Sequence, residues 1–373
     1  MPEHPSRNAA PPLPRGVAWG LAFEAVHDLA ATAFGLAAAV QIDGAPALVG
    51  LDTEGRLGWR TALPGPAVLV AGESSLFAVT DDLCVRVDPA DGGVAATQPI
   101  DPPSGGRAKG TTLVSGDALV LASGRGLLCL DAAGLRVRWR ADPGLDRTDA
   151  LLQLAANPTR IVAVANRLVT ALSAQGRQQW RRALPRGDAP AGSSPLLLDG
   201  DRVLIGLVPA SAPAERLLQA LSLADGRPLF DSAIRDLAMF CPAHVSGGVL
   251  VLDTHGGLAG FDLADRLSLL WTLQARVAFG ACIAQDGHLV VATRDGALLR
   301  VAIADGRART LLQMPSKTVW APPAPDLSPG VHTEPAGAIE HLAILPQGVA
   351  FSVRWSADHA AIQLRPGSND RVI

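Results

Sequence analysis

The sequence is poor in the residues that usually reveal a metal site or a disulfide scaffold. It has no tyrosine, eight phenylalanines and four cysteines among 373 residues. The cysteines are scattered, without a Cys-x-x-Cys pair, so neither a zinc ribbon nor a disulfide framework is indicated. Single cysteines in apolar runs are most often buried small hydrophobic residues. We therefore expect buried thiols, including those of Cys241 and Cys282, which the repeat described below assigns to inner strands of neighbouring units.

Long apolar runs and a strong net charge are also absent. No run approaches the about 18 apolar residues that cross a bilayer, and residues 1–15 lack the basic and apolar pattern of a secretion signal. The net charge is −3 and the pI is about 6.2, which argues against a nucleic-acid partner. We expect a disordered tail at residues 1–15, no membrane insertion and a cytoplasmic location, or a periplasmic one if a signal sequence has been removed.

What the sequence does contain is a tryptophan that recurs at a regular step. The series consists of Trp19, Trp59, Trp139, Trp180 and Trp271, at steps of 40, 80, 41 and 91 residues. The step of 80 spans two units, with Thr97 near the vacant position. Phe230 divides the last step into 50 and 41, and the surplus residues lie in 208–216. The period is therefore about 41 residues, which is typical of a structural repeat.

Each unit contains four short apolar segments separated by turns. The stretch "FGACIAQDGHLVVATRDGALLRVAIADGRART", residues 279–310, shows all four, separated by Gln-Asp-Gly, Arg-Asp-Gly and Ala-Asp-Gly. Asp-Gly favours tight hairpins because glycine accepts a positive φ angle. Four strands in each repeat predict the blades of a β-propeller. The recurring tryptophans are predicted to bury their rings between neighbouring blades.

The count of units predicts eight blades, with seven as the alternative if the degenerate units merge. Seven units run from about residue 27 to residue 315. The last segment, 339–367, supplies three strands, and "GVAWGLAF" at residues 16–23 supplies the fourth strand of the same blade. Such a closure removes exposed sheet edges. The chain is thus predicted to be one all-β propeller domain over 16–373, with loop insertions at 207–217 and 314–337.

The repeat unit resembles a known family. The stretch "LVGLDTEGRLGWRTALP", residues 48–64, and its echoes at 127–143 and 169–185 resemble the pyrroloquinoline-quinone-like (WD40-like) propeller repeat. The resemblance covers roughly residues 16–367 and implies the propeller fold. The superfamily includes quinoprotein alcohol dehydrogenases and an eight-bladed outer-membrane assembly lipoprotein. The adjacent cysteines and calcium ligands of the quinoprotein enzymes have no counterpart here, so we expect no enzyme activity, no cofactor and no metal.

Other catalytic patterns are also incomplete. In "SGGRAKGTT", residues 104–112, Lys109 precedes Gly110, whereas a phosphate-binding loop needs Gly-Lys-Ser/Thr in that order. The eight histidines contain no His-Glu-x-x-His motif. We therefore predict no catalytic residues from the sequence.

Candidate partner-binding residues lie in the loops between the second and third strands of each unit and in the two insertions. The loops contain Asp43, Asp82, Arg125, Arg167, Glu215 and Arg216, His255, Arg294 with Asp295, and Asp358 with His359. The Pro-rich insertion 314–337 is predicted to cross one face of the propeller as an extended loop. It contains Lys317 and Trp320, and Trp320 and Trp355 are both out of register with the tryptophan series.

These observations favour a non-catalytic scaffold that presents loops to a protein partner, as a subunit or adaptor of a bacterial multi-protein assembly. Two alternatives stay open. One is a propeller that binds a small ligand or sugar at a polar channel mouth, as a degenerate relative of the quinoproteins. The other is an envelope assembly factor, if a signal peptide has been removed. Fold analogy alone does not choose among them.

Overall fold

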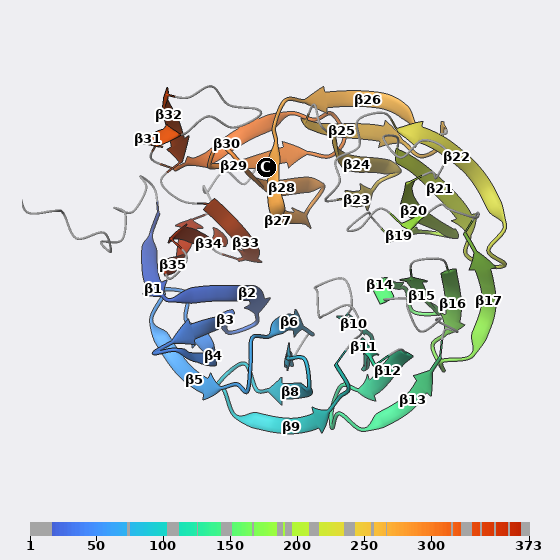
Figure 1. Ribbon diagram of the computed structural model, residues 1–373, viewed down its shortest axis with the longest axis horizontal. Coiled ribbons are helices and arrows are strands. Elements are labelled where there is room, and N and C mark those ends of the chain that lie inside the picture. The colour runs from blue at the N-terminus through green and yellow to red at the C-terminus, as the bar shows by residue number, and fades with distance from the viewer. Residues whose placement is uncertain are drawn as a thin grey trace, which may run out of the picture.

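The computed structural model describes most of the chain. The described residues are 17–72, 75–102, 112–124, 126–142, 151–165, 168–184, 189–190, 196–208, 216–234, 243–254, 257–265, 267–314, 316–321, 330–335, 338–346, 348–356 and 359–366. Eight antiparallel blades follow one another around a central axis, as Figure 1 shows. The predicted eight-bladed propeller is confirmed.

The first four blades are four-stranded meanders. Blade 1 contains β2 (Ala25–Thr32), β3 (Gly35–Ile42), β4 (Ala45–Leu51) and β5 (Leu57–Ala62). Blade 2 contains β6 (Val68–Ala71), β7 (Leu76–Val79), β8 (Leu83–Val87) and β9 (Val94–Pro99). Blade 3 contains β10 (Thr112–Ser115), β11 (Ala118–Ser123), β12 (Gly126–Asp131) and β13 (Val137–Ala141). Blade 4 contains β14 (Leu151–Ala156), β15 (Arg160–Ala165), β16 (Leu168–Ser173) and β17 (Gln178–Ala183).

The next three blades repeat this order. Blade 5 contains β19 (Leu196–Asp199), β20 (Arg202–Val208), β21 (Arg216–Ser222) and β22 (Pro228–Ile234), and the short β18 (Ala189–Pro190) also pairs with β20. Blade 6 contains β23 (Ala243–Ser246), β24 (Val249–Thr254), β25 (Gly257–Asp262) and β26 (Ser268–Leu273). Blade 7 contains β27 (Val277–Gln285), β28 (His288–Thr293), β29 (Ala297–Ala302) and β30 (Ala308–Gln313).

Blade 8 joins the two ends of the chain. It contains β33 (Ala338–Leu345), β34 (Gly348–Ser356) and β35 (His359–Pro366), and β1 (Trp19–Phe23) completes it as the fourth strand. Trp19 lies opposite Leu364 and Phe23 opposite Ala360. The first and last blades share one buried apolar cluster, which contains Val49 and Ile362. The predicted closure by the N-terminal strand is therefore confirmed.

The tight turns follow from residues that favour them. Between β4 and β5, the Asp52 carboxylate accepts hydrogen bonds from the backbone nitrogens of Glu54 at 2.8 Å and Arg56 at 2.9 Å. Gly55 has a φ angle of +78° in this turn, a conformation that glycine adopts without strain. The stretch Leu48–Gly65 is thus one copy of a hairpin that recurs around the ring.

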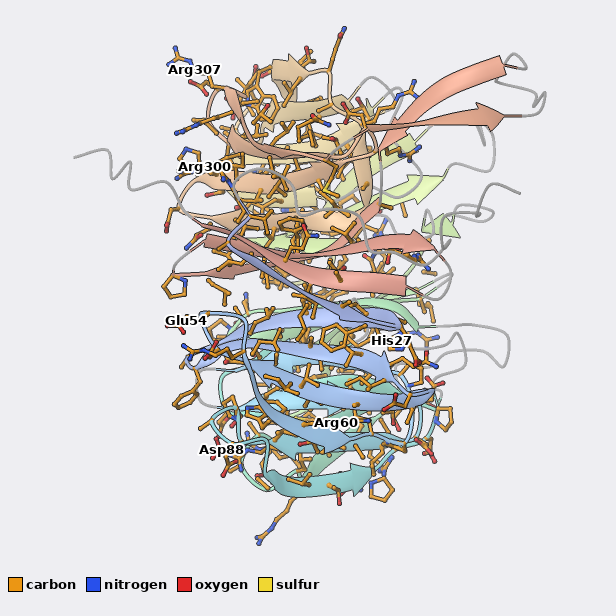
Figure 2. The ribbon with its side chains drawn as sticks, turned by 90° about the vertical axis from the view of Figure 1, so that its left-hand side faces the viewer. His27, Glu54, Arg60, Asp88, Arg300 and Arg307 are labelled. Carbon is orange, nitrogen blue, oxygen red and sulfur yellow. The ribbon has the colours of Figure 1, made fainter. Side chains whose placement is uncertain are left out.

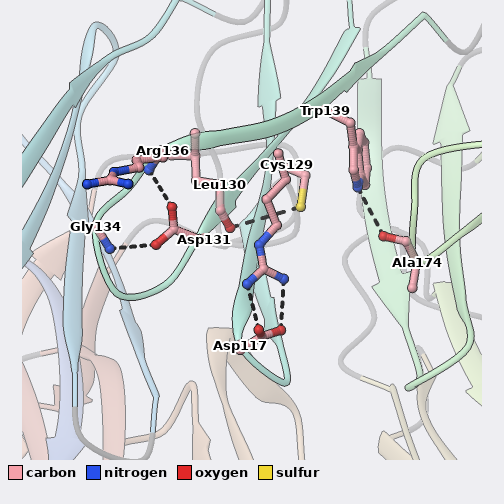
Figure 3. Close-up of polar contacts among 9 residues, drawn as sticks. Asp117, Cys129, Leu130, Asp131, Gly134, Arg136, Trp139 and Ala174 are labelled. Atoms are coloured by element: carbon pink, nitrogen blue, oxygen red, sulfur yellow. Dashed lines mark hydrogen bonds and ion pairs between the residues drawn. The ribbon is translucent and has the colours of Figure 1, made fainter.

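The recurring tryptophans hold neighbouring blades together. The indole nitrogen of Trp59 donates to the Pro89 carbonyl of blade 2 at 3.1 Å, and that of Trp139 donates to the Ala174 carbonyl of blade 4 at 3.0 Å (Figure 3). Trp180 and Trp271 make the equivalent bonds to the next blade at 2.8 and 2.9 Å. All four indoles thus lie between blades as predicted, but only Trp180 is buried, and Trp59, Trp139 and Trp271 are partly buried. The Trp19 side chain lies outside the described part.

Two details of the sequence interpretation change. The ladder of blade 2 places Ala96 opposite Arg86, where Trp59 lies opposite Gly50 in blade 1. The vacant tryptophan position therefore belongs to Ala96, the residue before Thr97.

The second change concerns the insertion 314–337, part of which is a hairpin instead of an unpaired extended loop. Strand β31 (Ser316–Ala321) pairs with β32 (Gly330–Pro335) outside the eight blades. The prolines at 322, 323, 325 and 329 stand between β31 and β32 in the sequence, and Pro335 is the last residue of β32, so the ladder positions between Lys317 and Glu334 contain no proline.

The side chains of Cys84 and Cys129 are buried, as predicted. Cys282 lies in the inner strand β27, without a description of its side chain, and Cys241 lies outside the described residues. Within the described part of the chain, no helix has the length and apolar character needed to cross a membrane.

Candidate functional site

We call upper face the side of the disc on which the second strand of each blade ends and the third begins, with described turns at residues 43–44, 80–82 and 294–296. The same face receives the connections from each blade to the next. The turns between third and fourth strands lie on the opposite, lower face, where Figure 2 shows Glu54, Asp88 and Arg307 along one edge of the disc. The topology thus gathers on one face the loops that the sequence predicts for partner binding.

The structure describes these predicted residues to different degrees. Four of them, all exposed, lie in second-to-third turns, namely Asp43, Asp82, Arg294 and Asp295. Asp43 has a left-handed φ angle of 54°. For five others only the backbone is described, and these are Arg216 in β21, Lys317 and Trp320 in β31, Trp355 in β34 and His359 in β35. Arg125, Arg167, Glu215, His255 and Asp358 lie outside the described residues. Their contribution to binding stays a prediction.

Hydroxyl side chains hold the turns of the upper face in shape. The Thr80 hydroxyl accepts from the Leu83 nitrogen at 3.0 Å, and the Thr293 hydroxyl accepts from the Ala297 nitrogen at 2.9 Å. Thr254 donates to the Gly257 carbonyl at 2.6 Å in the same position of blade 6. These turns are also tied to the interblade connections. A face with such preformed turns loses little conformational entropy when a partner binds.

The β31–β32 hairpin extends this face. It connects the end of β30 to the start of β33, and both of these positions lie on the upper face. Figure 2 shows its two strands projecting beyond the disc, on the side away from Glu54. In its ladder Lys317 lies opposite Glu334 and Trp320 lies opposite Val331. A two-stranded hairpin is marginally stable by itself in water.

An acidic group at the upper face was not predicted from the sequence. Asp253 ends the buried part of β24 and is 4% exposed. Burial raises its pKa to about 6, although the nearby Arg294 guanidinium and the Val277 backbone N–H both lower it. Arg294 comes from blade 7, so the structure brings a predicted rim residue next to a buried carboxylate of blade 6. A comparison of aligned repeats could have found Asp253, because four of the other blades have alanine or valine there.

A second buried carboxylate lies on the inner strands. Asp28 of β2 accepts from the Leu29 nitrogen at 2.7 Å and from the Leu69 nitrogen of β6 at 2.9 Å. His341 of β33 lies 3.9 Å from the same carboxylate. This group therefore joins blades 8, 1 and 2 along the channel.

Below Asp28, the channel contains a cavity of about 400 Å³ between the inner strands of blades 7, 8, 1 and 2. It is lined mainly by apolar side chains, among them Leu29, Val70, Ile283 and Ile344. The cavity lies at the ends of the first strands, near the lower face and away from the polar loops of the upper face. Among the residues that the structure describes, no group of three or more His, Cys, Asp or Glu is arranged to hold a metal ion.

The comparisons with known proteins follow this geometry. Residues 80–308 match the family profile described as outer membrane protein assembly factor BamB. The chain belongs to this family of PQQ-like propellers. The resemblance drawn from the repeat is thereby confirmed. A search of curated proteins finds no match to this chain.

Solved structures share the fold at low sequence identity. BamB from Moraxella catarrhalis aligns with a TM-score of 0.59 and 12% identity, over 92% of this chain and 98% of that one. The quinohemoprotein alcohol dehydrogenase from Comamonas testosteroni aligns with a TM-score of 0.58 and 10% identity, over 95% and 77%. The computationally designed protein Ika8 aligns with a TM-score of 0.60 and 12% identity, over 91% and 96%. An assembly factor, an enzyme and a designed protein thus share one architecture, which shows the fold alone.

Proposed function

We propose that this protein is a non-catalytic scaffold that binds a protein partner through its upper face and the β31–β32 hairpin. The observation that carries the proposal is the hairpin itself, since it forms a separate two-stranded sheet outside the eight closed blades. Within the described part of the chain, neither outer edge of this sheet pairs with a further strand. A two-stranded sheet gains stability from a further strand or surface. The family profile, which is described as that of an assembly factor, supports the same class of function.

The proposed contact set combines the hairpin with the ring of loops. It consists of Lys317, Trp320, Trp355, Arg125, Arg167, Glu215, Arg216, His255, Arg294, Asp358 and His359. Tryptophan and arginine are the residue types most often found at the energetic centre of protein interfaces. We therefore expect Trp320 and Arg294 to contribute more to affinity than the other members.

The test is affinity capture from the native host with mass spectrometry, using the intact chain and a variant whose residues 318–335 are replaced by a short Gly-Ser linker. A matched control keeps the hairpin and replaces residues 53–55 of the lower face by Gly-Ser. The proposal predicts a partner that the intact chain and the control retain and the hairpin variant loses. The purified partner should then bind the intact chain, and Trp320→Ala should weaken it on the order of tenfold or more.

Equal capture by all three variants would place the contact elsewhere, and no capture by any of them would count against a scaffold. The apolar cavity near the lower face then favours the other candidate, a protein that binds an apolar small molecule. A thermal shift with a panel of apolar ligands tests this, since a ligand at 100 times its Kd stabilises the fold by about 2.7 kcal/mol.

The proposal includes a cytoplasmic location for the protein. Fractionation of the native host, with the start of the native gene determined, tests it directly. Recovery of the protein from the envelope fraction would replace the cytoplasmic assignment by that of an envelope assembly factor.

A further inference from the structure

Asp253 breaks a pattern that four other blades keep. Near the end of the second strand, the aligned residue is Val79 in blade 2, Ala122 in blade 3, Val164 in blade 4 and Ala292 in blade 7, and each is at most 2% exposed. In blade 6 the ladder assigns this position to Asp253, which lies opposite Leu258. The fold therefore does not require a carboxylate here, since a small apolar side chain fills the same space in four other blades.

The carboxylate lies on the side of β24 that faces blade 7. Val251, two residues earlier on the strand, packs in the cluster that contains Val277 and Val291 of blade 7. Because side chains alternate along a strand, the side chains of Asp253 and Val251 lie on the same side of β24. The Val277 backbone nitrogen donates to the Asp253 carboxylate. A group of one blade thus holds the first residue of the inner strand of the next.

Arg294 completes the cluster from the upper face. Its Nε donates to the Val277 carbonyl at 3.4 Å and its backbone nitrogen donates to the Arg276 carbonyl at 2.8 Å. Val277 therefore has one polar contact to Asp253 and another to Arg294. The other charged group in this turn, Asp295, accepts a hydrogen bond from the Thr293 hydroxyl. The Arg294 guanidinium is the charged group that acts on Asp253. His244 of β23, which lies opposite Val251, is a titratable side chain on the same face of blade 6, and burial lowers its pKa.

We propose that Asp253, Val277 and Arg294 form a proton-controlled joint between blades 6 and 7, which holds Arg294 on the upper face while Asp253 is ionised and releases it when Asp253 is protonated. The attraction between carboxylate and guanidinium disappears when the carboxyl takes up a proton, and the bond from the Val277 N–H weakens at the same time. The joint itself stands on this geometry. Its role in partner binding rests on the function proposed above, of which Arg294 is a contact residue.

The pKa of Asp253 gives the joint a definite pH range. Since the folded value of about 6 lies above the ordinary aspartate value, the folded protein binds a proton that the unfolded chain has already released. Stability therefore falls as the pH rises towards 6 and is constant above that value. Asp253→Asn, which keeps the shape and removes the charge, should lack this fall. Arg294→Gln should move the midpoint of the fall to higher pH, because the guanidinium lowers the Asp253 pKa.

The experiment is carried out on the isolated full chain, so it does not depend on a partner. Thermal unfolding between pH 4 and 8 is compared for the wild type, Asp253→Asn, Arg294→Gln and the exposed control Asp265→Asn. The joint predicts that Asp253→Asn matches the wild type near pH 4 and unfolds about 2–4 °C higher above pH 7. Asp265→Asn should have the same unfolding temperature as the wild type both near pH 4 and above pH 7. A pH-independent difference between Asp253→Asn and the wild type would overturn the proposal.

A second measurement examines Arg294 directly. Hydrogen exchange of the peptide that contains residues 288–302 should be slower in the wild type than in Asp253→Asn at pH 7.5, and equal at pH 5. Equal exchange at both pH values would overturn the joint.

The purified partner then tests the regulatory part. Its affinity for the wild type should differ between pH 5 and pH 7.5, and that for Asp253→Asn should change less. Equal pH dependence for both would remove the regulatory role and leave the joint. Failure to find a partner would affect only the proposed function.

Discussion

Six contacts between neighbouring blades, among the described residues, are of two kinds, and the difference shows how one repeat joins its neighbour in two ways. We call tryptophan seams the contacts between blades 1 and 2, 3 and 4, 4 and 5, and 6 and 7, where an outer-strand indole donates to a carbonyl of the next blade. We call arginine seams the contacts between blades 2 and 3 and between blades 5 and 6. There Arg86 donates to the Ala133 carbonyl and Arg202 to the Leu263 carbonyl, both at 3.0 Å.

The space beside the donor is also filled in two ways. In the tryptophan seams the facing turn contains a glycine with a positive φ angle, and these are Gly92, Gly176, Gly226 and Gly306. A Cβ on Gly92 would lie 2.5 Å from a Trp59 ring atom, so only glycine leaves room for the indole. In the arginine seams the same turn position contains a leucine with a positive φ angle, Leu135 at 56° and Leu267 at 70°. Both leucines are buried.

The leucine therefore replaces, from one side of the seam, the volume that the tryptophan supplies from the other. A leucine in the left-handed conformation is strained, and its burial between the blades offsets that cost. Ala96 and Phe230 occupy the tryptophan position in these two seams, and Phe230 packs in the same cluster as Leu267. Both kinds of seam thus contain a large apolar side chain and one hydrogen bond across the seam, but different residues provide them.

The largest effect is expected from removal of the most buried indole. Trp180 is 8% exposed, and Trp180→Ala should lower the free energy of unfolding by about 3–5 kcal/mol through loss of packing. Trp180→Phe keeps much of the volume and loses the bond to the Leu223 carbonyl, so it should cost about 1–2 kcal/mol. Urea unfolding followed by circular dichroism measures both. A smaller loss for Ala than for Phe would contradict the role of the indole as a spacer.

The second prediction converts an arginine seam into a tryptophan seam. Leu135→Gly alone should cost about 2–4 kcal/mol because a buried side chain is lost. Ala96→Trp alone should cost about 1–3 kcal/mol, since the indole overpacks against Leu135. In the double variant each change makes room for the other, and we expect a favourable coupling of about 1–3 kcal/mol. A double-mutant cycle by urea unfolding measures it, and simple additivity would show that the two positions do not share one space.

A third and smaller effect concerns the donor of the arginine seam. Arg202→Met keeps much of the aliphatic volume and removes the bond to the Leu263 carbonyl. It should lower the free energy of unfolding by about 1 kcal/mol, the usual net value of one such bond. Thermal unfolding compares it with Arg300→Met, whose side chain lies on the exposed lower part of β29. Equal effects of the two changes would mean that the bond across the seam contributes nothing measurable.

The subtlest comparison uses the native thiols as reporters. Cys84 packs in the cluster of the seam between blades 2 and 3, together with Leu135, and Cys129 packs in that between blades 3 and 4, together with Trp139. Burial raises the pKa of Cys129 to about 11, so at pH 8 it reacts with a thiol reagent only when its seam opens. Peptide mass spectrometry of the labelled protein measures the labelling rate of each thiol.

The matched variant is Trp139→Ala. It should accelerate labelling of Cys129 on the order of tenfold or more, because about 1.4 kcal/mol is one factor of ten. Cys84 should keep its rate in this variant. Acceleration at both thiols would indicate a global loss of stability instead of the opening of one seam.

The sequence by itself determined what depends on neighbouring residues. The Asp-Gly turns and the alternation of apolar residues predict each hairpin, and the period of the tryptophans predicts the number of blades. The closing pair of chain ends followed from counting strands at residues 16–23 and 339–367. These features are readable because a turn or a strand is specified by a few consecutive residues.

Tertiary structure alone decided what depends on residues about 30–60 positions apart. The sequence contains both Asp253 and Arg294, yet only the contact of blades 6 and 7 makes them one cluster and removes the carboxylate from water. The sequence shows the glycine of a turn, but not that Leu135 takes its position when the preceding outer strand lacks an indole. The pairing of β31 with β32 across a proline-rich stretch belongs to the same class. In each case burial and shape at a seam, and not local propensity, select the residue, because the free energy of a side chain depends on what packs against it.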